Sequence, residues 1–278
     1  MKTPKKLAAL VEEGLVDEVI GQLMSGKEAT VYVVRCGQNI RCAKVYKDAN
    51  QRSFRKNAFY QEGRKVKNSR QARAMDKGSR YGRKMQEDVW QNAEVDALYR
   101  LAAAGVRVPQ PHLCFEGVLL MDLILDAEGH AAPRLNDVDL SEELALEFHA
   151  LLVNQVVRML CAGVIHGDLS EYNILVGDGG PVIIDLPQAV DAAGNSNAAE
   201  MFARDVGNLR TYFSAFAPAL SHTQFDKEIW AHYEGGSLHP DLRLTGRVEL
   251  DERLADVDAV LLQVDLAIKE NEIRRMCQ

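Results

Sequence analysis

The sequence predicts an α+β protein with two lobes, a strand-rich first lobe and a helix-rich second lobe. Segments with alternating apolar residues dominate between residues 21 and 124, whereas helical periodicity dominates after residue 136. A polar connector that contains Gly129 and Pro133 separates the two patterns. The length of 278 residues suits either two domains or one domain of two lobes.

Three regions are expected along the chain: an N-terminal helix in residues 1–20, a first lobe in residues 21–124 and a second lobe in residues 125–278. The N-terminal helix is predicted because residues 4–20 carry apolar side chains at roughly helical spacing. The first lobe contains a basic insertion at residues 51–85, which we expect to be flexible.

Two strands are predicted in the stretch VYVVRCGQNIRCAKVYK, where apolar side chains flank a turn at Gly37–Asn39. Lys44 lies near the middle of the second strand, between Ala43 and Val45. A lysine in an otherwise apolar strand needs an anionic partner, because an unpaired buried charge is costly. Two further strands are expected around a turn in residues 106–124.

A helix is expected over residues 86–105, and a long amphipathic helix over residues 137–163 with Asp139 or Ser141 as its N-cap. The stretch VGDGGPV that follows predicts a hairpin turn. From about residue 198 onward the chain is expected to be mostly helical.

Charge is distributed unevenly along the chain. The net charge is −7, yet residues 51–85 hold twelve Lys or Arg against Glu62 and Asp76, so this segment carries +10 and the remainder −17. One interpretation is a solvated insertion, and the other is a surface for nucleic acid or an acidic partner. Composition alone leaves both interpretations open.

The five cysteines are odd in number and form no C-x-x-C pair, which favours reduced thiols and a cytoplasmic location over disulfides or a zinc site. We find no run of about 18 uncharged apolar residues, so no membrane span is expected.

The stretch VIHGDLSEYNIL places polar residues among apolar ones and fits the pattern D-x-x-x-x-N with Asp168 and Asn173. Asp185 follows Asn173 after 12 positions, a spacing that lets a hairpin return it to the same place. Phosphoryl transfer needs a positioned hydroxyl, a proton acceptor and cations over the phosphates. Asp168 would orient the hydroxyl, and the oxygens of Asn173 and Asp185 suit Mg²⁺.

The same chemistry requires a cation on the strand-rich side, and Lys44 is the candidate for the α- and β-phosphates. Glu94, on the helix expected after the insertion, would face inward and hold the lysine in place. The stretch SGKEATVY, between two predicted strands, would form a turn over the phosphates.

Seven motifs together resemble the RIO family of atypical serine protein kinases, in its short RIO1-type form. They occur in the family's order between about residues 20 and 215, and they are MSGKEATVYVV, CAKVYK, GVRVPQP, APRLNDV, VIHGDLSEYNILV, IIDLPQAV and FARDVGNL. The resemblance implies a bilobal protein-kinase-like fold that uses ATP and Mg²⁺, with Mn²⁺ as a second candidate metal. It implies serine phosphorylation, autophosphorylation and an ATPase-like cycle, and it suggests a contact with the ribosome or RNA.

The resemblance also implies roles for individual residues. Met121 would border the adenine pocket, and Asp122 and Ile124 would offer backbone groups to the base. Asp168 would be the catalytic base, and Asp185 would serve both as a metal ligand and as a phosphate acceptor. Ser25 and Gly26 would lie over the phosphates. The implied roles of Lys44, Glu94 and Asn173 agree with those inferred above from the residues themselves.

Departures from ordinary protein kinases are expected to matter. Gly167 replaces the Arg of the H-R-D motif, so no activation-loop phosphorylation switch is expected. No A-P-E sequence follows Asp185, and only 19 residues separate it from Asp205, so the usual peptide-docking platform should be missing. Asp205 would either brace the catalytic loop or form a surface ion pair with Arg204.

Two other functions remain open from the sequence. A small-molecule kinase of the aminoglycoside or choline type also uses H-G-D-x-x-x-x-N, but it would lack GKEATVY and the basic insertion. A non-catalytic module that binds RNA through residues 51–85 is the other alternative, although every expected catalytic residue is in place.

Overall fold

A computed structural model describes residues 4–47 and 93–247 of the chain. All helices and strands within these ranges belong to one compact unit, Met1–Gly246. The basic insertion at 51–85 and the C-terminal part of the expected second lobe, residues 248–278, lie outside the described residues.

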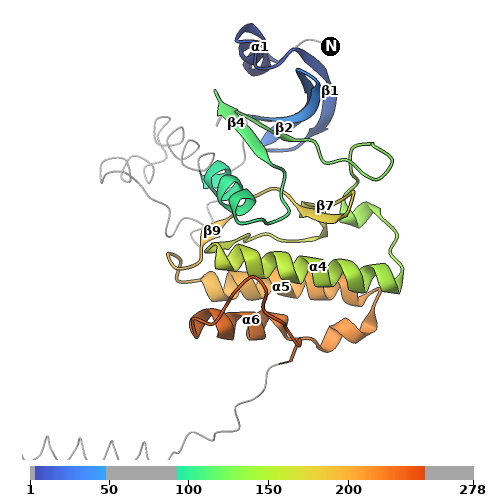
Figure 1. Cartoon of the computed structure of the whole chain (residues 1–278), viewed down its shortest axis with the longest axis vertical. Helices are drawn as coiled ribbons and strands as arrows, with labels where there is room; N and C mark the ends of the chain where they lie inside the picture. The colour runs from blue at the N-terminus through green and yellow to red at the C-terminus, as the bar shows by residue number, and fades with distance from the viewer. Residues whose placement is uncertain (1–3, 48–92, 248–278) are drawn as a thin grey trace, which may run out of the picture. The chain divides into compact units, whose positions relative to one another are not determined.

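The first lobe is built on a five-stranded antiparallel sheet with the strand order β1-β2-β3-β5-β4 (Figure 1). Its strands are β1 (Glu18–Ser25), β2 (Ala29–Cys36), β3 (Asn39–Tyr46), β4 (Pro111–Phe115) and β5 (Val118–Asp122). The predicted turn between β2 and β3 is confirmed, because Cys36 pairs with Asn39. The predicted pair of strands around a turn in residues 106–124 is confirmed as β4 and β5.

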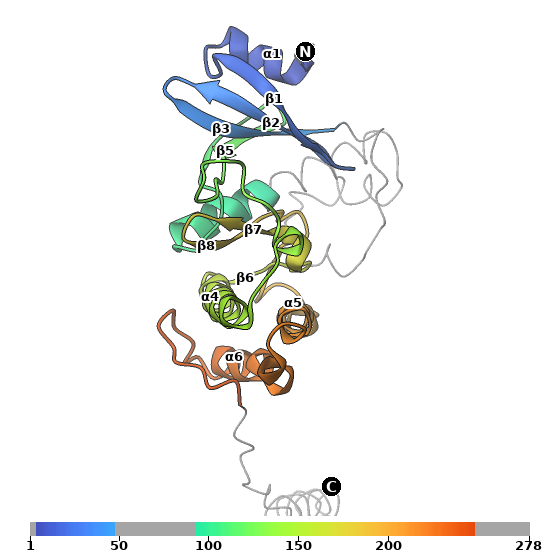
Figure 2. The ribbon, with the colours of Figure 1, turned by 90° about the vertical axis from the view of Figure 1, so that its right-hand side faces the viewer.

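The N-terminal helix is shorter than the sequence predicts. Helix α1 spans Lys5–Glu12, Gly14 adopts a φ of +70°, and the chain then enters β1 instead of continuing as a helix to residue 20. The backbone of Gly14 leaves the helical region, so Leu15 and Val16 lie in the connection between α1 and β1 instead of in a helix. Figure 2 shows α1 on the side of the sheet that faces away from the second lobe.

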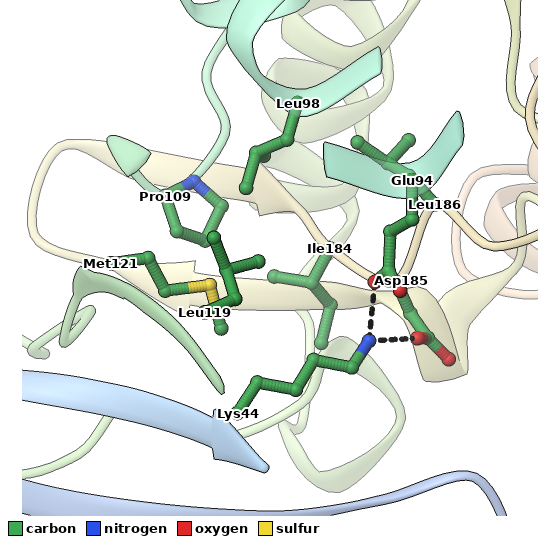
Figure 3. A pocket seen from close by; sticks show the side chains of 9 residues that line it. All are labelled: Lys44, Glu94, Leu98, Pro109, Leu119, Met121, Ile184, Asp185 and Leu186. Atoms are coloured by element: carbon green, nitrogen blue, oxygen red, sulfur yellow. Dashed lines mark hydrogen bonds and ion pairs between the residues drawn. The ribbon is translucent and has the colours of Figure 1, made fainter. Parts of the chain in front are cut away.

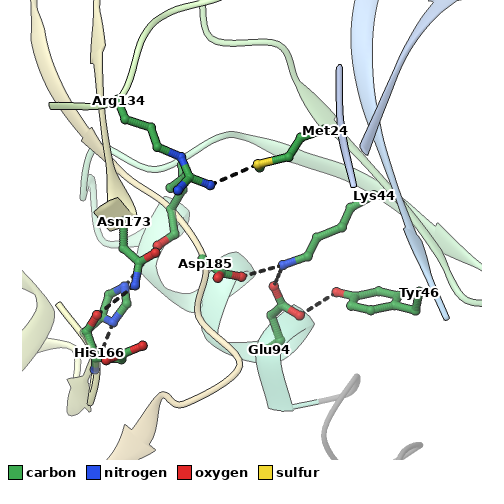
Figure 4. Close-up of polar contacts among 10 residues, drawn as sticks. Met24, Lys44, Tyr46, Glu94, Arg134, His166, Asn173 and Asp185 are labelled. Atoms are coloured by element: carbon green, nitrogen blue, oxygen red, sulfur yellow. Dashed lines mark hydrogen bonds and ion pairs between the residues drawn. The ribbon is translucent and has the colours of Figure 1, made fainter. Parts of the chain in front are cut away.

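Successive side chains of β3 point to opposite faces of the sheet, and the two faces have different surroundings. Ala43 and Val45 are buried in a small core with Leu7 and Leu10 of α1. Lys44 and Tyr46 point to the opposite face, toward the second lobe (Figure 4). The lysine therefore sits in an apolar strand without entering the core beneath α1.

A helix over residues 93–103 covers the second face of the sheet. Its buried residues Glu94, Ala97, Leu98 and Leu101 recur at the spacing of a helix face. Gly105 follows the helix with a φ of +71°, as the sequence predicts for its end. The first part of the predicted helix lies among residues that are not described.

The second lobe is mainly helical, and α4, α5 and α6 pack against one another (Figure 1). Its elements are η3 (Leu135–Asp137), α4 (Glu142–Cys161), β6 (Val164–Ile165), η4 (Glu171–Asn173), β7 (Ile174–Gly177), β8 (Gly180–Ile183), β9 (Val190–Asp191), α5 (Ala198–Ser214), η5 (Pro218–His222) and α6 (Phe225–Glu234). Ser141 is the N-cap of α4, and its hydroxyl accepts a hydrogen bond from the Leu144 N–H at 3.2 Å.

Helix α4 has the length and the apolar composition of a helix that could span a membrane. Its buried side chains include His149 and Gln155, and it packs against α5 and α6. We therefore assign α4 to the core of the lobe.

Two short two-stranded sheets position the loops between α4 and α5. Strand β7 pairs with β8, which confirms the predicted hairpin, and β6 pairs with β9. Between Asp185 and the start of α5 at Ala198 the chain forms only β9 and turns. This short connection leaves no room for the helical segments of a peptide-docking platform.

Candidate active site

A small cavity lies where β3 and β5 face the segment after β8 (Figure 3). It is lined by Lys44, Glu94, Leu98, Pro109, Leu119, Met121, Ile184, Asp185 and Leu186. The charged side chains gather at one end, and apolar side chains such as Pro109 and Met121 line the other (Figure 3). Such a cavity suits a ligand with an apolar ring and a charged tail.

Lys44 is the centre of the charged end. Its Nζ donates hydrogen bonds to Glu94 Oε1 at 2.5 Å and to Asp185 Oδ1 at 2.8 Å, so the predicted Lys44–Glu94 ion pair is confirmed (Figure 4). Burial alone would lower the pKa of Lys44, but the two carboxylates raise it well above its usual value. The lysine therefore remains an ammonium ion although its side chain is only 12% exposed.

Glu94 has a second partner that fixes its direction. The hydroxyl of Tyr46 donates to Glu94 Oε2 at 2.8 Å, so both carboxylate oxygens are bonded. Glu94 is 5% exposed, and a buried carboxylate needs such partners. Alternation places Tyr46 on the same face of β3 as Lys44, two residues away.

Asp185 reaches the site through an unusual backbone conformation. Its φ is +65°, in the left-handed region that residues other than glycine rarely adopt. Burial would raise the pKa of its carboxyl, but the Lys44 ammonium beside it lowers that pKa below its usual value. The Lys44–Asp185 contact joins residues 141 positions apart and brings the two lobes together at this point.

The loop before β7 holds Asp168 and Asn173 beside Asp185. The Asn173 side-chain amide donates to the Asp168 carbonyl oxygen at 2.8 Å. Desolvation raises the pKa of Asp168, and the nearby carboxylate of Asp185 adds to that rise, although His166 opposes it. A carboxylate with a raised pKa is a better proton acceptor near neutral pH.

Buried groups brace this loop from below. Asp205 of α5 accepts hydrogen bonds from the N–H groups of Gly167 at 2.7 Å and Leu169 at 3.0 Å. Asp205 therefore braces the loop, and of the two roles left open by the sequence this is the one observed. Gly167 has a φ of +82°, so the glycine in place of arginine meets a backbone requirement.

His166 links the same loop to the segment that carries Asp185. Its Nδ1 accepts from the Asp168 N–H at 3.3 Å, and its Nε2 therefore donates to the Ile184 carbonyl at 3.0 Å. The histidine is 1% exposed, so both contacts are shielded from water.

The turn between β1 and β2 carries Ser25 and Gly26. Lys47 Nζ donates to the Gly26 carbonyl at 2.6 Å, and it lies 3.4 Å from Ser25 Oγ. A Cβ on Gly26 would meet only the Ala29 carbonyl, at 3.5 Å, so the turn has open space above it. Neither Ser25 nor Gly26 lines the cavity itself.

The expected adenine-binding segment lies just after β5. Met121 lines the cavity, whereas Asp122 and Ile124 do not. The Asp122 N–H donates to the Gln110 carbonyl, and the Ile124 carbonyl accepts from the Ala132 N–H. The Asp122 N–H and the Ile124 carbonyl are therefore already hydrogen-bonded. A ligand would bind the Asp122 carbonyl and the Ile124 N–H instead.

The residues present fit a magnesium ion. Asn173 bonds the Asp168 carbonyl through its amide nitrogen, so its side-chain oxygen can face a metal. Asp185 bonds Lys44 through one carboxylate oxygen, so its second oxygen can do the same. The oxygens that remain are the hard ligands that Mg²⁺ prefers, and this ion keeps several waters. The described residues contain no group of three or more His, Cys, Asp or Glu that could hold a metal.

Three residues at this site were missed by reasoning from the sequence: Tyr46, Lys47 and Arg134. Tyr46 could have been found from its alternation with Lys44. Arg134 stands between Pro133 and Leu135 in the APRL stretch, so the sequence shows a charged residue between apolar ones. That pattern does not indicate what the arginine does. Lys47 carried no signal that distinguishes it from a surface lysine.

A family comparison decides the class of this protein. Residues 30–227 match the model of the RIO1 family, described as the RIO domain. The chain belongs to the RIO family. The resemblance inferred from seven motifs is confirmed by this match.

Curated relatives of this RIO-family protein occur in archaea and eukaryotes. The RIO-type serine/threonine-protein kinase Rio1 of Haloferax volcanii is 35% identical over 207 residues, covering 73% of this chain and 66% of that protein. The Rio1 of Methanocaldococcus jannaschii is 31% identical over 241 residues, covering 86% and 76%. The serine/threonine-protein kinase rio1 of Schizosaccharomyces pombe is 31% identical, and this chain spans 45% of its length.

A solved structure supports the fold of this RIO-family protein. The Rio2 kinase–ADP/Mg²⁺–phosphoaspartate complex from Chaetomium thermophilum matches with a TM-score of 0.54 and 21% identity, covering 77% of this chain and 65% of that one. The predicted bilobal, kinase-like α+β fold is therefore confirmed.

Proposed function

We propose that this RIO-family protein is a Mg·ATP-dependent serine protein kinase that also hydrolyses ATP. The observation that carries the proposal is Lys44, bonded to both Glu94 and Asp185 at the charged end of an otherwise apolar cavity. Relatives that cover most of the chain are named serine/threonine-protein kinases. The arrangement supplies what phosphoryl transfer needs, which is positioning and charge stabilisation.

In this proposal the adenine ring occupies the apolar end of the cavity, beside Met121. The Asp122 carbonyl and the Ile124 N–H bind the edge of the ring. Lys44 holds the α- and β-phosphates, and Ser25 and Gly26 in the β1–β2 turn lie over the phosphate tail.

Asp168 accepts the proton of the incoming serine hydroxyl and orients its oxygen toward the terminal phosphate. Its raised pKa suits this role, and the brace from Asp205 keeps the loop in position. Asn173 and Asp185 hold Mg²⁺, which when bound neutralises charge on the β- and γ-phosphates.

An ATPase cycle would use Asp185 as the phosphate acceptor. The matching Rio2 structure contains a phosphoaspartate, and Asp185 is the residue that we assign to this role here. Its carboxylate oxygen would take the γ-phosphoryl group as ADP leaves, and water would then hydrolyse the acyl phosphate to release inorganic phosphate and restore the carboxylate. The Lys44 ammonium, which lowers the pKa of Asp185 against the effect of burial, keeps this carboxylate ionised.

The experiment that tests this function measures Mg-dependent turnover of labelled ATP by the wild type, Lys44→Ala and Asp168→Asn. Each variant is expected to lose at least about tenfold in rate, equivalent to roughly 1.4 kcal/mol of barrier. Lys5→Ala on α1 and Asp178→Asn in the β7–β8 turn are matched controls, because both residues are exposed. Equal rates in all five proteins would contradict the proposal.

The fate of the label separates the related activities. Label on serine of the protein or of a substrate indicates kinase activity, whereas free phosphate indicates ATPase activity. Label on small amines or sugar alcohols, with none on protein, would instead favour a small-molecule kinase.

We further propose a contact between the basic segment 51–85 and RNA or the ribosome, supported by its charge of +10 in a chain of net charge −7. Each phosphate neutralised by Lys or Arg adds about 0.7–0.9 to the slope of log affinity against log salt. A steep slope with model RNA whose magnitude falls by about three when four lysines or arginines are neutralised would support the contact. The reduced cysteines predict a cytoplasmic location, and the four in the described residues are free thiols.

A further inference from the structure

A second cation, Arg134, approaches the charged end of the cavity from the connector between the lobes. Its backbone is held in place, because Arg134 forms a bridge with Leu175 of β7 and the Pro133 carbonyl accepts from the Val176 N–H. The next residue, Leu135, is fully buried, and its carbonyl accepts from the Tyr212 hydroxyl at 2.9 Å. Arg134 therefore projects from a fixed point of the second lobe.

The side chain of Arg134 crosses to the first lobe. Its Nη2 lies 2.9 Å from Sδ of Met24, in β1 directly before Ser25 (Figure 4). Within residues 4–47 and 93–247, this thioether is the single hydrogen-bond acceptor recorded for the guanidinium. A thioether is a weak acceptor, and a guanidinium carries five N–H donors. The group is thus placed for a stronger, anionic acceptor.

The charges around the cavity also call for another cation. Lys44 is already shared between Glu94 and Asp185, and Asp168 adds a third carboxylate nearby. Lys44, and Arg204 whose field reaches Asp168, offset these three carboxylates only in part, so negative charge remains in excess without Arg134. A triphosphate adds more negative charge than a diphosphate, so its outer end needs positive charge beyond Lys44 and the metal.

Arg134 lies between the two segments that this proposal requires. Met24 leads into the turn over the phosphates, and Leu175 follows Asn173 by two residues. The field of Arg134 also reaches Asp185 and helps to lower the pKa of that carboxyl. Lys44, by contrast, lies deeper, in the lining of the cavity.

We propose that Arg134 binds the terminal phosphate of the nucleotide and makes the site prefer a nucleoside triphosphate over a diphosphate. This inference rests on the proposed function. The planar guanidinium can donate two parallel hydrogen bonds to phosphate oxygens, which a lysine cannot reproduce. When the Arg134 guanidinium exchanges Met24 Sδ for phosphate oxygens, residues of both lobes would contact the same ligand.

The test compares the Mg²⁺ complexes of ADP and of β,γ-imido-ATP, with dissociation constants measured by calorimetry on the full chain. Arg134→Met removes the charge but keeps length and apolar contact with Met24. It is expected to weaken binding of β,γ-imido-ATP about tenfold or more, with ADP affinity changed less than about twofold. Arg134→Lys is expected to recover only part of the loss, because it keeps the charge without the fork.

Arg35→Met is the matched control, since Arg35 lies at the far end of β2, paired with exposed Glu18. It should leave the ratio of the two affinities unchanged. An equal loss for both nucleotides in Arg134→Met, or no loss for either, would overturn the role of Arg134 while leaving the proposed function standing. Absence of binding by the wild type to both nucleotides would overturn the proposed function itself.

Discussion

Tyr46 and Glu94 show how a single hydroxyl can hold a charged network in place. Because Glu94 is 5% exposed and both its oxygens are bonded, loss of one donor leaves a buried carboxylate oxygen without its partner. We expect Tyr46→Phe to lower the free energy of unfolding by about 1–3 kcal/mol, measured by urea denaturation. ATP turnover should fall several-fold, since Glu94 would hold Lys44 less firmly.

Tyr99→Phe provides the control for this change, because Tyr99 lies on the same helix as Glu94 and has 41% of its surface exposed. It should alter neither stability nor turnover by a measurable amount. A Tyr46→Phe protein as stable as the wild type would show that Glu94 does not depend on the hydroxyl.

His149 predicts a pH dependence of stability. It is 2% exposed on α4, its ring lies 5.6 Å from that of Phe213, and its Nε2 has no hydrogen-bond partner among the described residues. Burial lowers its pKa from 6.5 to about 4. Between these values the unfolded chain binds more protons than the folded one, so stability falls as pH falls from 6.5 toward 4.

The difference between the two pKa values corresponds to about 3 kcal/mol of unfolding free energy. This contribution is fully present above pH 6.5 and is lost as the pH falls toward 4. The comparison is between urea denaturation of the wild type and of His149→Leu at pH 7 and pH 5. The variant should lose less stability on acidification, whereas exposed His239→Leu should behave like the wild type. Parallel pH profiles for wild type and His149→Leu would contradict the assignment.

At the scale of elements, α5 acts as the support of the loop that carries Asp168. Asp205 is 2% exposed and binds two backbone N–H groups of that loop, and Arg204 donates to the Gly167 carbonyl at 2.5 Å. The loop has little regular structure of its own, so these contacts decide its conformation. Asp185, whose φ is strained, is held in a similar way by its bond to Lys44.

Asp205→Asn should therefore lower ATP turnover by at least about tenfold while nucleotide affinity changes little. The amide can accept at one oxygen, but it presents an NH₂ group to a backbone N–H that needs an acceptor. Steady-state kinetics should show the loss in kcat rather than in KM. Glu200→Gln in the exposed first turn of α5 is the control, and a normal kcat in Asp205→Asn would refute the brace.

At the scale of the whole molecule, the two lobes meet through a shared core and through polar bridges. Tyr46, Leu98 and Leu119 of the first lobe belong to the same hydrophobic cluster as Leu152 and Phe202 of the second. Lys44–Asp185 and Arg134–Met24 cross between the lobes at the site itself. A ligand bound there contacts both lobes and stabilises the folded state as a unit.

This arrangement predicts a thermal shift with nucleotide. At a Mg·ATP concentration of 100 times Kd, the folded state should gain about 2.7 kcal/mol, which corresponds to a rise in Tm of roughly 5–10 °C for a domain of this size. Lys44→Ala should show a much smaller shift relative to its own ligand-free Tm. A wild-type Tm that does not respond to Mg·ATP would contradict nucleotide binding.

Much of the fold could be predicted because local patterns determine it. Alternation in VYVVRCGQNIRCAKVYK predicted β2 and β3, and Ser141 marked the start of α4. The error at the N-terminus arose because apolar spacing over residues 4–20 fits a helix followed by a strand as well as one helix. The structure decides between them: Gly14 has a left-handed φ after α1, and Leu7 and Leu10 of α1 pack with Val16 against the sheet.

The sequence alone determined the residue types and spacings of Lys44, Asp168, Asn173 and Asp185, because each stands in a local motif with its own chemical signature. Only the tertiary structure decided that Tyr46 bonds Glu94, that Asp205 faces the loop rather than solvent, and that Arg134 spans the lobes. These contacts join positions tens of residues apart. Their geometry follows from how strands, helices and connector pack together, and no local pattern encodes that packing.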